Sequence, residues 1–358
     1  MVKIFQKTLL KRASREYKKE YFKFFILQVF LLAFIANISG YLIGTRAVDD
    51  SYNNIKESMN LEDGMFSTFY KFDDNDMKNI EEQYDLKIKE NSFYKTKFVN
   101  HNGVDNYVNV YSNREEINKI FVETGRMPES TNEILLEHTY ANYNNYKIND
   151  NITICDQDFK IVGTGYFPDF SCIYKNDTDI AFKYKEFLVS YVNEDTFTEF
   201  PVHDVTYSYS YQFNKALSDE EREKTNEDIK HSINELAKQK VNLVVNFKSA
   251  EENHNITTPK NCASQYTPII LIFFYILIAI IAFVFSINTI SRIIEEAKVI
   301  GTLRATGISR KQMIGFYLLL PEFVIFTSSV FGNLIGYYIL APYFANLFMD
   351  IFSFHLNP

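Results

Sequence analysis

The stretch FFILQVFLLAFIANISGYLIG, residues 24–44, contains twenty-one residues and no charged side chain. At a rise of about 1.5 Å per residue, a helix of this length crosses about 30 Å of hydrocarbon. A cleaved signal peptide is the competing interpretation, but its apolar core is normally about 7–15 residues long and lies closer to the N-terminus. Here a basic segment of 23 residues comes first. The stretch is therefore predicted to be an uncleaved membrane-spanning helix.

Two further apolar runs follow much later in the chain. Residues 268–290 form a run of 23 residues that opens with Pro268, which a helix tolerates in its first turn. The third run extends over residues 314–341 and contains one charged residue, Glu322, beside Pro321. The mean hydropathy of the whole chain is nevertheless slightly negative, because the interval between the first two runs is polar. The sequence predicts a membrane protein with three spans.

The charges that flank the runs predict the orientation. Eight Lys or Arg and two Glu precede the first run, and five Lys or Arg and two Glu lie between the second and third. By the positive-inside rule both segments face the cytoplasm. The interval between the first two spans, with 39 acidic and 24 basic residues, is then extracytoplasmic. Since no basic surface is left to meet phosphates, nucleic acid is not expected as a partner.

The predicted division of the chain follows from these runs and charges. It comprises a cytoplasmic basic amphipathic segment (1–23), a first span (24–44), an extracytoplasmic α+β domain (45–267), a second span (268–290), a cytoplasmic loop (291–313), a third span (314–341) and an extracytoplasmic tail (342–358). The basic segment suits an interfacial helix on the inner leaflet, with a charged tail that fixes topology as the alternative.

The extracytoplasmic interval is predicted to fold as α+β. Residues 101–103, His-Asn-Gly, are a hairpin signal between two strand-like runs. Ser218 and Glu221 form a capping box that begins a helix with Ile229 and Ile233 on one face. The strand-like runs are residues 85–100, 104–111, 151–155, 159–166, 187–192 and 241–247.

The loop between the second and third spans reads EEAKVIGTLRATGISRKQMI, residues 295–314. Its periodicity predicts a short amphipathic helix with Ile300 and Leu303 on the apolar stripe. Gly307 suits the end of this helix, and Ser309 is able to cap the helix that enters the third span. Periodicity alone leaves an ordinary basic turn between two membrane helices as an equal alternative.

The run IGTLRATG, residues 300–307, closely resembles the hallmark of the FtsX-like permease family. In that family the loop follows the second span and is the cytoplasmic coupling element that docks on a partner ATPase. Many members have Glu directly before the Ile, where this chain has Val299. By position, the matching residues are Ile300, Gly301, Leu303, Arg304, Ala305 and Gly307. A rigid helix that exposes Arg304, Arg310 and Lys311 is able to sit in a groove and transmit a push to the two attached spans.

A second set of motifs lies in the extracytoplasmic interval. It is similar, in order and spacing, to the core of the MacB-like domain found in these permeases. Gly125 and Pro128 in this set are turn residues and are expected to be structural. The motifs are GRMP (125–128), NEILL (132–136), DNITI (150–154) and FKIVG (159–163). The family places three spans after this domain and the chain has two, so we hypothesise that it is the N-terminal part of a longer or split permease.

Polar and small residues of the third span add three candidates. Glu322 is the ionisable residue deep in an apolar span, a costly position in lipid. We expect a structural or coupling role for it, with a substrate path, or pairing with a cytoplasmic Arg, as alternatives. Gly332 and Gly336 have the GxxxG spacing that lets two helix backbones approach closely. Their expected partner is the first span or a second permease chain.

Several kinds of chemistry are excluded by the residues. The sequence contains no GxxxxGK[ST] phosphate-binding loop, no cysteine or histidine pattern for a metal and no catalytic constellation. The chain is therefore expected not to be an enzyme and to hold no cofactor or metal, with ATP bound by a partner subunit. Cys155 and Cys172 would both lie outside the membrane, and the sequence leaves open whether they form a disulfide.

The resemblance implies the permease subunit of an ABC-type transporter in the cell membrane. Its expected partners are an ABC ATPase, a second permease chain or half, and the lipid bilayer. The implied activity is export or extraction of a substrate at the outer face, driven by ATP hydrolysis in the partner. The alternative is a mechanotransmission or sensing protein that regulates an extracytoplasmic partner without moving cargo, and a weaker one is a passive membrane-anchored binding domain.

Overall fold

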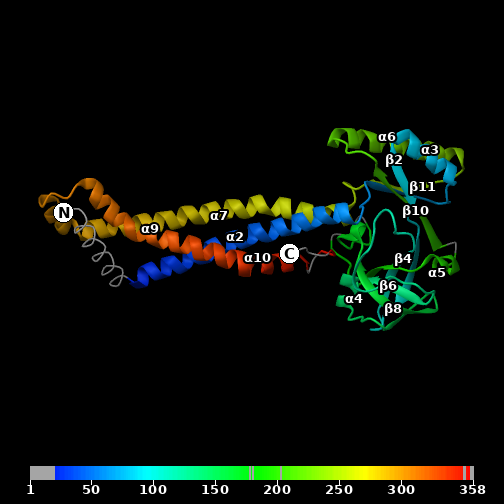
Figure 1. The fold of residues 1–358 in the computed structure, drawn as a ribbon, viewed down its shortest axis with the longest axis horizontal. Helices are drawn as coiled ribbons and strands as arrows, with labels where there is room; N and C mark the ends of the chain where they lie inside the picture. Colours follow the sequence, from blue (N-terminus) through cyan, green and yellow to red (C-terminus); the bar gives the residue numbers. More distant parts are fainter. Residues whose placement is uncertain (1–20, 177–178, 180, 202–203, 350–351, 355–358) are drawn as a thin grey trace. The chain divides into compact units, whose positions relative to one another are not determined.

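The structure is a computed structural model that describes residues 21–176, 179, 181–201, 204–349 and 352–354 (Figure 1). The chain divides into two compact units. The first, here called the helical unit, contains residues 1–47 and 263–347, and the second, the sheet unit, contains residues 48–262 and 348–358. Most of the predicted interfacial segment, residues 1–20, lies outside the described residues.

Long apolar helices form the helical unit. Among the described residues, three stretches are long and apolar enough to cross a membrane: Phe24–Ser58, Tyr266–Glu295 and Arg310–Leu347. The predicted number of spans is therefore confirmed. The helices are α2 (Tyr21–Ser58), α7 (His254–Glu295), α8 (Ala297–Ala305), α9 (Arg310–Ile335) and α10 (Ala341–Met349), with a π-helical turn η3 (Gly336–Leu340) between the last two.

Each of these stretches extends past its predicted span, which ended at residue 44, 290 or 341. The reason is clearest for α2, whose last turns carry a second apolar stripe at helical spacing, formed by Val48, Tyr52 and Ile55. These side chains are buried in the sheet unit. The tail predicted from residue 342 likewise begins as a helix, because α10 continues through Met349.

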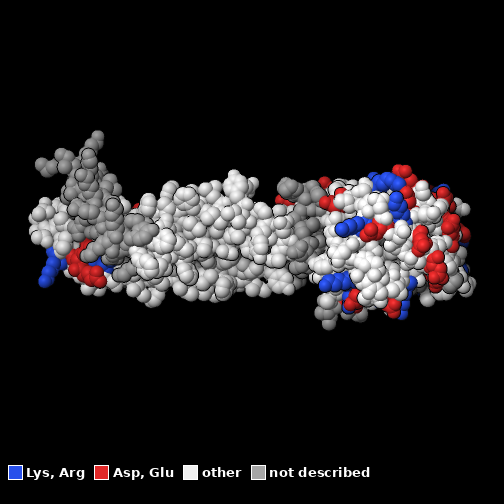
Figure 2. Space-filling model, turned by 90° about the horizontal axis from the view of Figure 1, so that it is seen from below, with Lys and Arg blue, Asp and Glu red and all other residues white. Residues whose placement is uncertain are grey.

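The helical unit differs from an ordinary soluble bundle in its surface. The three long helices run side by side in Figure 1, and the face seen in Figure 2 is uncharged along their length, with charged side chains gathered at one end. None of the most apolar window of α7 is buried among the described residues. An apolar helix without a cover of protein matches a hydrocarbon surrounding.

The sheet unit is built on one mixed sheet. Among the described residues its strand order is β11-β1-β10-β3-β4-β9-β6-β8-β5, with β2 beside β10 and β7 beside β8. The strands are β1 (Gly64–Thr68), β2 (Leu86–Glu90), β3 (Phe93–Val99), β4 (Asp105–Tyr111), β5 (Phe121–Gly125), β6 (Glu133–Glu137), β7 (Asn151–Ile154), β8 (Gln157–Tyr166), β9 (Phe187–Tyr191), β10 (Val205–Phe213) and β11 (Val244–Ser249).

Four strands at one end of the sheet form a first lobe with two helices, α3 (Asp74–Tyr84) and α6 (Asp219–Gln239). Their order, β11-β1-β10-β2 with antiparallel neighbours, is that of a split βαβ arrangement. Both helices cover the same face (Figure 1), where Ile80, Ile229 and Ile233 pack on Phe66 and Tyr211. The opposite face carries small polar side chains instead.

The second lobe, residues 93–200, is inserted between β2 and β10 and contains the rest of the sheet with the short helices α4 (His138–Tyr143) and α5 (Glu194–Glu199). It has an apolar cluster on each face of the sheet. Parallel pairing of β4 with β9 and of β6 with β8 makes the sheet mixed. The fold is thus three membrane-spanning helices with an α+β domain between the first and second, as predicted.

The predicted local structure of the domain is confirmed at several points. Strands β3 and β4 pair antiparallel around residues 101–103, and β7 pairs with β8. Ser218 and Glu221 make both bonds of the capping box of α6. The run over residues 85–100, however, is two strands, because the buried Asn91 and Ser92 interrupt it and bond to β10.

Candidate functional site

The loop between the second and third spans folds as a short helix with defined ends. Helix α8 covers Ala297–Ala305, and Gly307, at φ +97°, turns the chain after it in the left-handed conformation that favours glycine. Ser309 caps α9, accepting a hydrogen bond from the backbone N–H of Gln312, whose side chain bonds back to Ser309. The helix, its glycine end and the cap agree with the sequence prediction.

The apolar stripe of α8 is occupied within the chain. Ile300, Leu303 and Ile308 are partly buried and pack on Met313 and Tyr317 of α9. These side chains fix α8 against the first turns of α9, so the stripe is internal packing and is not left free for another protein.

Polar contacts hold the end of α7 in the same cluster. The Tyr317 hydroxyl donates to Glu296 Oε2 at 2.6 Å, and Glu296 is the residue directly before α8. The guanidinium of Arg292 lies 5.7 Å from the ring centres of both Phe24 and Tyr317. The end of α7, α8 and the start of α9 therefore form one connected element.

The remaining predicted loop residues lie on the surface. Gly301, Arg304 and Ala305 are exposed on α8 and neighbour one another at spacings of three and four residues. A Cβ atom at Gly301 would meet nothing within 4 Å, so the chain itself gives no packing reason for glycine inside this helix. The residues exposed on and after α8 are Gly301, Arg304, Ala305, Gly307, Arg310 and Lys311.

Gly332 and Gly336 lie against the first span. A Cβ atom on Gly332 would stand 2.9 Å from Ile35 Cβ, and one on Gly336 would stand 2.8 Å from Ser39 Cβ. Two glycines of α2, Gly40 and Gly44, make similar approaches to η3 and α10. This second pair was not predicted from the sequence, although its spacing of four residues is the same signal.

Glu322 lies on the exposed side of α9, next to the buried Pro321. No hydrogen bond or ion pair joins it to another residue in the part of the chain that the structure describes. The alternative of a pair with a cytoplasmic Arg is not formed among these residues.

A second site, not foreseen from the sequence, lies in the sheet unit, where the ends of the long helices enter it. Val48, Ile55 and Met59 of the α2 region pack on Cys172, Phe352 and Phe354. Beside them, Tyr52 and Leu61 pack on Ala250 and Ile256, the latter in the first turn of α7. The sheet unit therefore holds three chain segments: the end of α2, the start of α7 and residues 352–354, which follow α10.

Residues 171–174, here called the junction loop, bond to two of these segments. The Cys172 N–H donates to Asn255 O and the Tyr174 N–H to Asn255 Oδ1, both at 2.8 Å. The Ser353 N–H donates to Ser171 O at 2.7 Å. One four-residue loop thus fixes both the start of α7 and the segment after α10.

Ser353 is also bonded to a buried carboxylate. Its hydroxyl donates to Glu137 Oε1 and accepts from Thr139 Oγ1, and the Glu137 carboxylate caps α4 through the N–H groups of Thr139 and Tyr140. Burial raises the pKa of Glu137, against the opposite effect of the hydrogen bonds from Ser353, Thr139 and Tyr140. No sequence signal marks this contact, because its partners are more than two hundred residues apart.

The junction loop contains Cys172, one of the two cysteines for which the sequence left a disulfide open. Cys172 is buried in the sheet unit and Cys155 lies on the surface, and neither belongs to a disulfide. The disulfide left open by the sequence is not formed.

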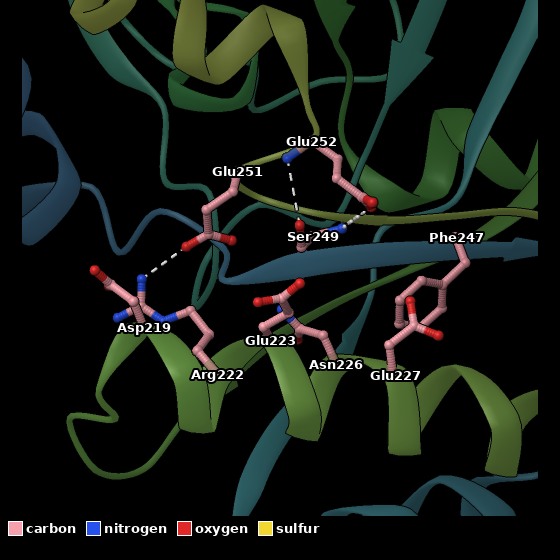
Figure 3. A pocket seen from close by; sticks show the side chains of 9 residues that line it. All are labelled: Asp219, Arg222, Glu223, Asn226, Glu227, Phe247, Ser249, Glu251 and Glu252. Carbon is pink, nitrogen blue, oxygen red and sulfur yellow. Dashed lines mark hydrogen bonds and ion pairs between the residues drawn. The ribbon is translucent and has the colours of Figure 1, made fainter.

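An acidic cleft of about 310 Å³ lies between α6 and the end of β11 (Figure 3). Arg222 donates to Glu251 Oε1 at 2.7 Å, and Ser249 and Glu252 bond to each other. The other carboxylates of the lining leave the cleft negative. The lining residues are Asp219, Arg222, Glu223, Asn226, Glu227, Phe247, Ser249, Glu251 and Glu252. In the described part of the chain no group of His, Cys, Asp and Glu is arranged to hold a metal ion.

Comparisons with known proteins give one match to the C-terminal part of the chain and separate matches to solved extracellular or periplasmic domains. Residues 271–358 match the sequence model of a family described as FtsX-like permease C-terminal. The matched residues include the loop with α8, and the match bears out the predicted resemblance. The chain is also similar to the extracellular domain of the noncanonic ABC-type transporter YknZ from Gram-positive bacteria, at 13% identity and a TM-score of 0.32, over 51% of this chain and 100% of that chain.

A second similar structure is the periplasmic region of MacB from Actinobacillus actinomycetemcomitans. It is 10% identical, with a TM-score of 0.32, over 54% of this chain and 94% of that chain. No curated protein matches the chain.

Proposed function

We propose that this chain is the permease subunit of an ABC-type transporter and that a separate ATPase docks on the exposed face of α8. The observation that carries the proposal is the match of residues 271–358 to the FtsX-like permease family, together with the free face of α8 inside that match. The sequence has no phosphate-binding loop, so the energy is supplied by the partner.

The contacts around α8 support a docking role. Ile300 and Leu303 fix the helix to α9, while Gly301, Arg304 and Ala305 stay uncovered. Glycine costs a helix about 1 kcal/mol relative to alanine. Since nothing in the chain comes within 4 Å of the missing Cβ of Gly301, a close approach by a partner backbone explains the glycine better than internal packing does.

The junction supports transmission of the movement to the extracytoplasmic domain. We propose that a push on α8 moves α7 and α9 together, since Glu296 and Tyr317 join them. The start of α7 and the segment after α10 are both bonded to the junction loop, through Asn255 and Ser353. A rigid-body shift of the spans would then displace this loop and drive export or extraction of a substrate at the outer face.

Affinity purification of the tagged chain from membranes in mild detergent tests the proposal. We expect an ATPase with a phosphate-binding loop among the co-purifying proteins, reduced at least tenfold by Arg304→Glu. The matched control is Lys224→Glu, the same charge reversal on the exposed side of α6. Co-purification that survives Arg304→Glu, or is lost equally with Lys224→Glu, would contradict docking on α8.

A surface of the sheet unit favours a second candidate, in which the chain regulates an extracytoplasmic partner. Phe69 and Tyr70, 61% and 59% exposed, stand next to Leu243 and Val245, 64% and 59% exposed. Asn242 holds the Tyr70 backbone by two hydrogen bonds, of 2.9 and 2.7 Å. The backbone under this apolar surface is therefore fixed before any partner binds. Exposed apolar surface of this kind marks contacts with other proteins.

Vesicles that contain the purified chain and its ATPase distinguish the two candidates. Movement of cargo on addition of ATP, which survives Phe69→Ser with Leu243→Ser, supports the transporter. ATP turnover without movement of any cargo, together with an outer protein that is released by the same pair of substitutions, supports the regulator.

A further inference from the structure

The link between α2 and the first strand of the domain contains a buried carboxylate that the proposed function does not use. Helix α2 ends at Ser58 and β1 begins at Gly64. Glu62 lies between them, and only 2% of its surface is exposed. A carboxylate is rarely buried in this way without a charged group in direct contact.

Glu62 is held by side chains from two other parts of the sheet unit. Its Oε2 accepts from Asn118 Nδ2 at 2.7 Å and from Ser210 Oγ at 2.6 Å, and its N–H donates to Asn118 Oδ1 at 2.9 Å. Asn118 follows β4, and Ser210 lies on the polar face of β10. One carboxylate thus joins the link, the segment before β5 and the first lobe.

The backbone of the link is bonded to the same segment. The Asn118 N–H donates to Asn60 O and the Lys119 N–H to Met59 O, both at 2.8 Å. Asn60 Nδ2 donates to the Glu116 carbonyl at 2.9 Å. Residues 59–62 therefore lie along residues 116–119 like two short strands, with the Glu62 side chain at the inner end of the pair.

The charges around Glu62 are also buried. Arg114 is paired with Asp169 at 2.5 Å and lies 4.0 Å from the centre of the Tyr111 ring. Two of its nitrogens, Nε and Nη2, have no acceptor among the described residues. Burial, and in turn the charge of Glu62, raise the pKa of two neighbouring tyrosines, Tyr111 and Tyr211.

At the outer rim of the pair of segments, Glu116 is paired with Lys87 and Lys89 of β2. These charges are exposed at the surface. Among the groups that act on Glu62, the buried charge of Asp169 disfavours a second negative charge, while Arg114 acts in the opposite sense.

Burial and the charge of Asp169 together raise the pKa of Glu62 to about 7, against the hydrogen bonds from Ser210 and Asn118 and the charge of Arg114. The neutral form of Glu62 is thus favoured while residues 59–62 lie against residues 116–119, which we call the closed link. The ionised form is stabilised when its charge is hydrated by water. Opening the pair of segments is the smallest change that would expose it.

We propose that Glu62 is a proton-operated latch, which holds residues 59–62 on residues 116–119 when it is neutral and releases them when it is ionised. The latch would set how firmly the domain is tied to the end of α2, according to the pH outside the membrane. It needs no ATPase and does not depend on the proposed function.

Hydrogen exchange of the full chain in detergent, measured at pH values between about 5.5 and 8.5, tests the latch. The reporters are the backbone amides of Glu62, Asn118 and Lys119, each of which donates across the pair of segments. After correction for the intrinsic rate, we expect their protection to fall by up to about tenfold per pH unit as the pH rises to about 7 and to level off above it, because the closed link holds a proton that the open link releases until Glu62 is ionised in both. Amides of β4 serve as the internal reference and should not change.

Two variants keep the test decisive. Glu62→Gln should give protection that does not vary with pH, and Asp169→Asn should move the transition to lower pH, because it removes the negative charge that opposes ionisation. Protection of the reporters that is constant with pH in the unaltered chain would overturn the proposal. So would a transition that persists in Glu62→Gln, or one that Asp169→Asn leaves at the same pH while β4 remains protected.

Discussion

The helical unit and the sheet unit use polar residues in opposite ways. In the helical unit, helices approach through glycines such as Gly332 and Gly40, and apolar side chains cover the surface. In the sheet unit, ionisable groups such as Glu62, Arg114 and Asp169 are buried and tie distant segments together. Helix contacts in lipid need close approach rather than the hydrophobic effect, whereas a domain in water is able to bury its apolar side chains and reserve its polar ones for fixing a unique arrangement. Substitutions in the two units should therefore destabilise the chain for different physical reasons.

Loss of the buried ion pair should have the largest effect. Arg114→Met leaves Asp169 charged and buried without its partner, which typically costs about 3–5 kcal/mol. We expect the free energy of unfolding of the sheet unit to fall by this amount in denaturant titrations followed by circular dichroism.

The double variant Arg114→Met with Asp169→Leu is the control for that experiment. It removes both charges and should recover much of the loss, since a buried pair is often replaceable by apolar residues. If the double variant is less stable than Arg114→Met alone, the loss in Arg114→Met does not come from an unpaired buried charge on Asp169.

A pH dependence of stability follows from Glu62. Its pKa in the folded chain is raised from 4.5 to about 7, so the folded state binds more protons than the unfolded state between these values. The free energy of unfolding therefore decreases as the pH rises through this window, by at most roughly 3 kcal/mol at 1.36 kcal/mol per unit. We expect the unaltered chain to lose this much more than Glu62→Gln over the same window, measured by denaturant titration at each pH. Equal losses in the two chains would show that Glu62 does not titrate as described.

The glycine contacts of the helical unit give a smaller effect. Gly336→Leu forces a side chain into the backbone of α2, where a Cβ would already stand 2.9 Å from Ala36 O. Overpacking of this kind costs about 1–3 kcal/mol, measured here as a fall in thermal stability in detergent. Gly315→Leu in α9 is the matched control, because a Cβ there meets nothing within 4 Å. If both variants lose the same stability, helix propensity rather than packing explains the loss.

The same comparison shows what the sequence was able to predict. The spans followed from length and apolarity, and the hairpin around residues 101–103 and the cap at Ser218 followed from local turn and capping chemistry. These signals lie within a few residues of one another. The facing glycines of α2 carried an equally local signal, which was overlooked.

The junction and the latch could not be predicted in this way. Glu137 meets Ser353 across 216 positions, and Glu62 meets Ser210 across 148. A buried carboxylate looks in sequence like any exposed one, so its surroundings become known only with the fold. The docking role of Gly301, Arg304 and Ala305 stays a prediction, because it concerns a surface whose partner lies outside this chain.

Gly301 provides the smallest and most selective change. Gly301→Ala should stabilise α8 by up to about 1 kcal/mol, because alanine is the better helix former and the structure leaves open space around the new methyl group. Gly301→Leu finds the same open space and should leave the chain folded. The two variants differ only in how far they project from the exposed face. If a partner backbone approaches α8 there, Gly301→Leu should reduce ATPase co-purification strongly and Gly301→Ala only slightly, with no loss of thermal stability of the permease in either variant. Equal co-purification with both would mean that the partner does not contact this face, and the docking surface would then have to lie around Arg310 and Lys311 instead.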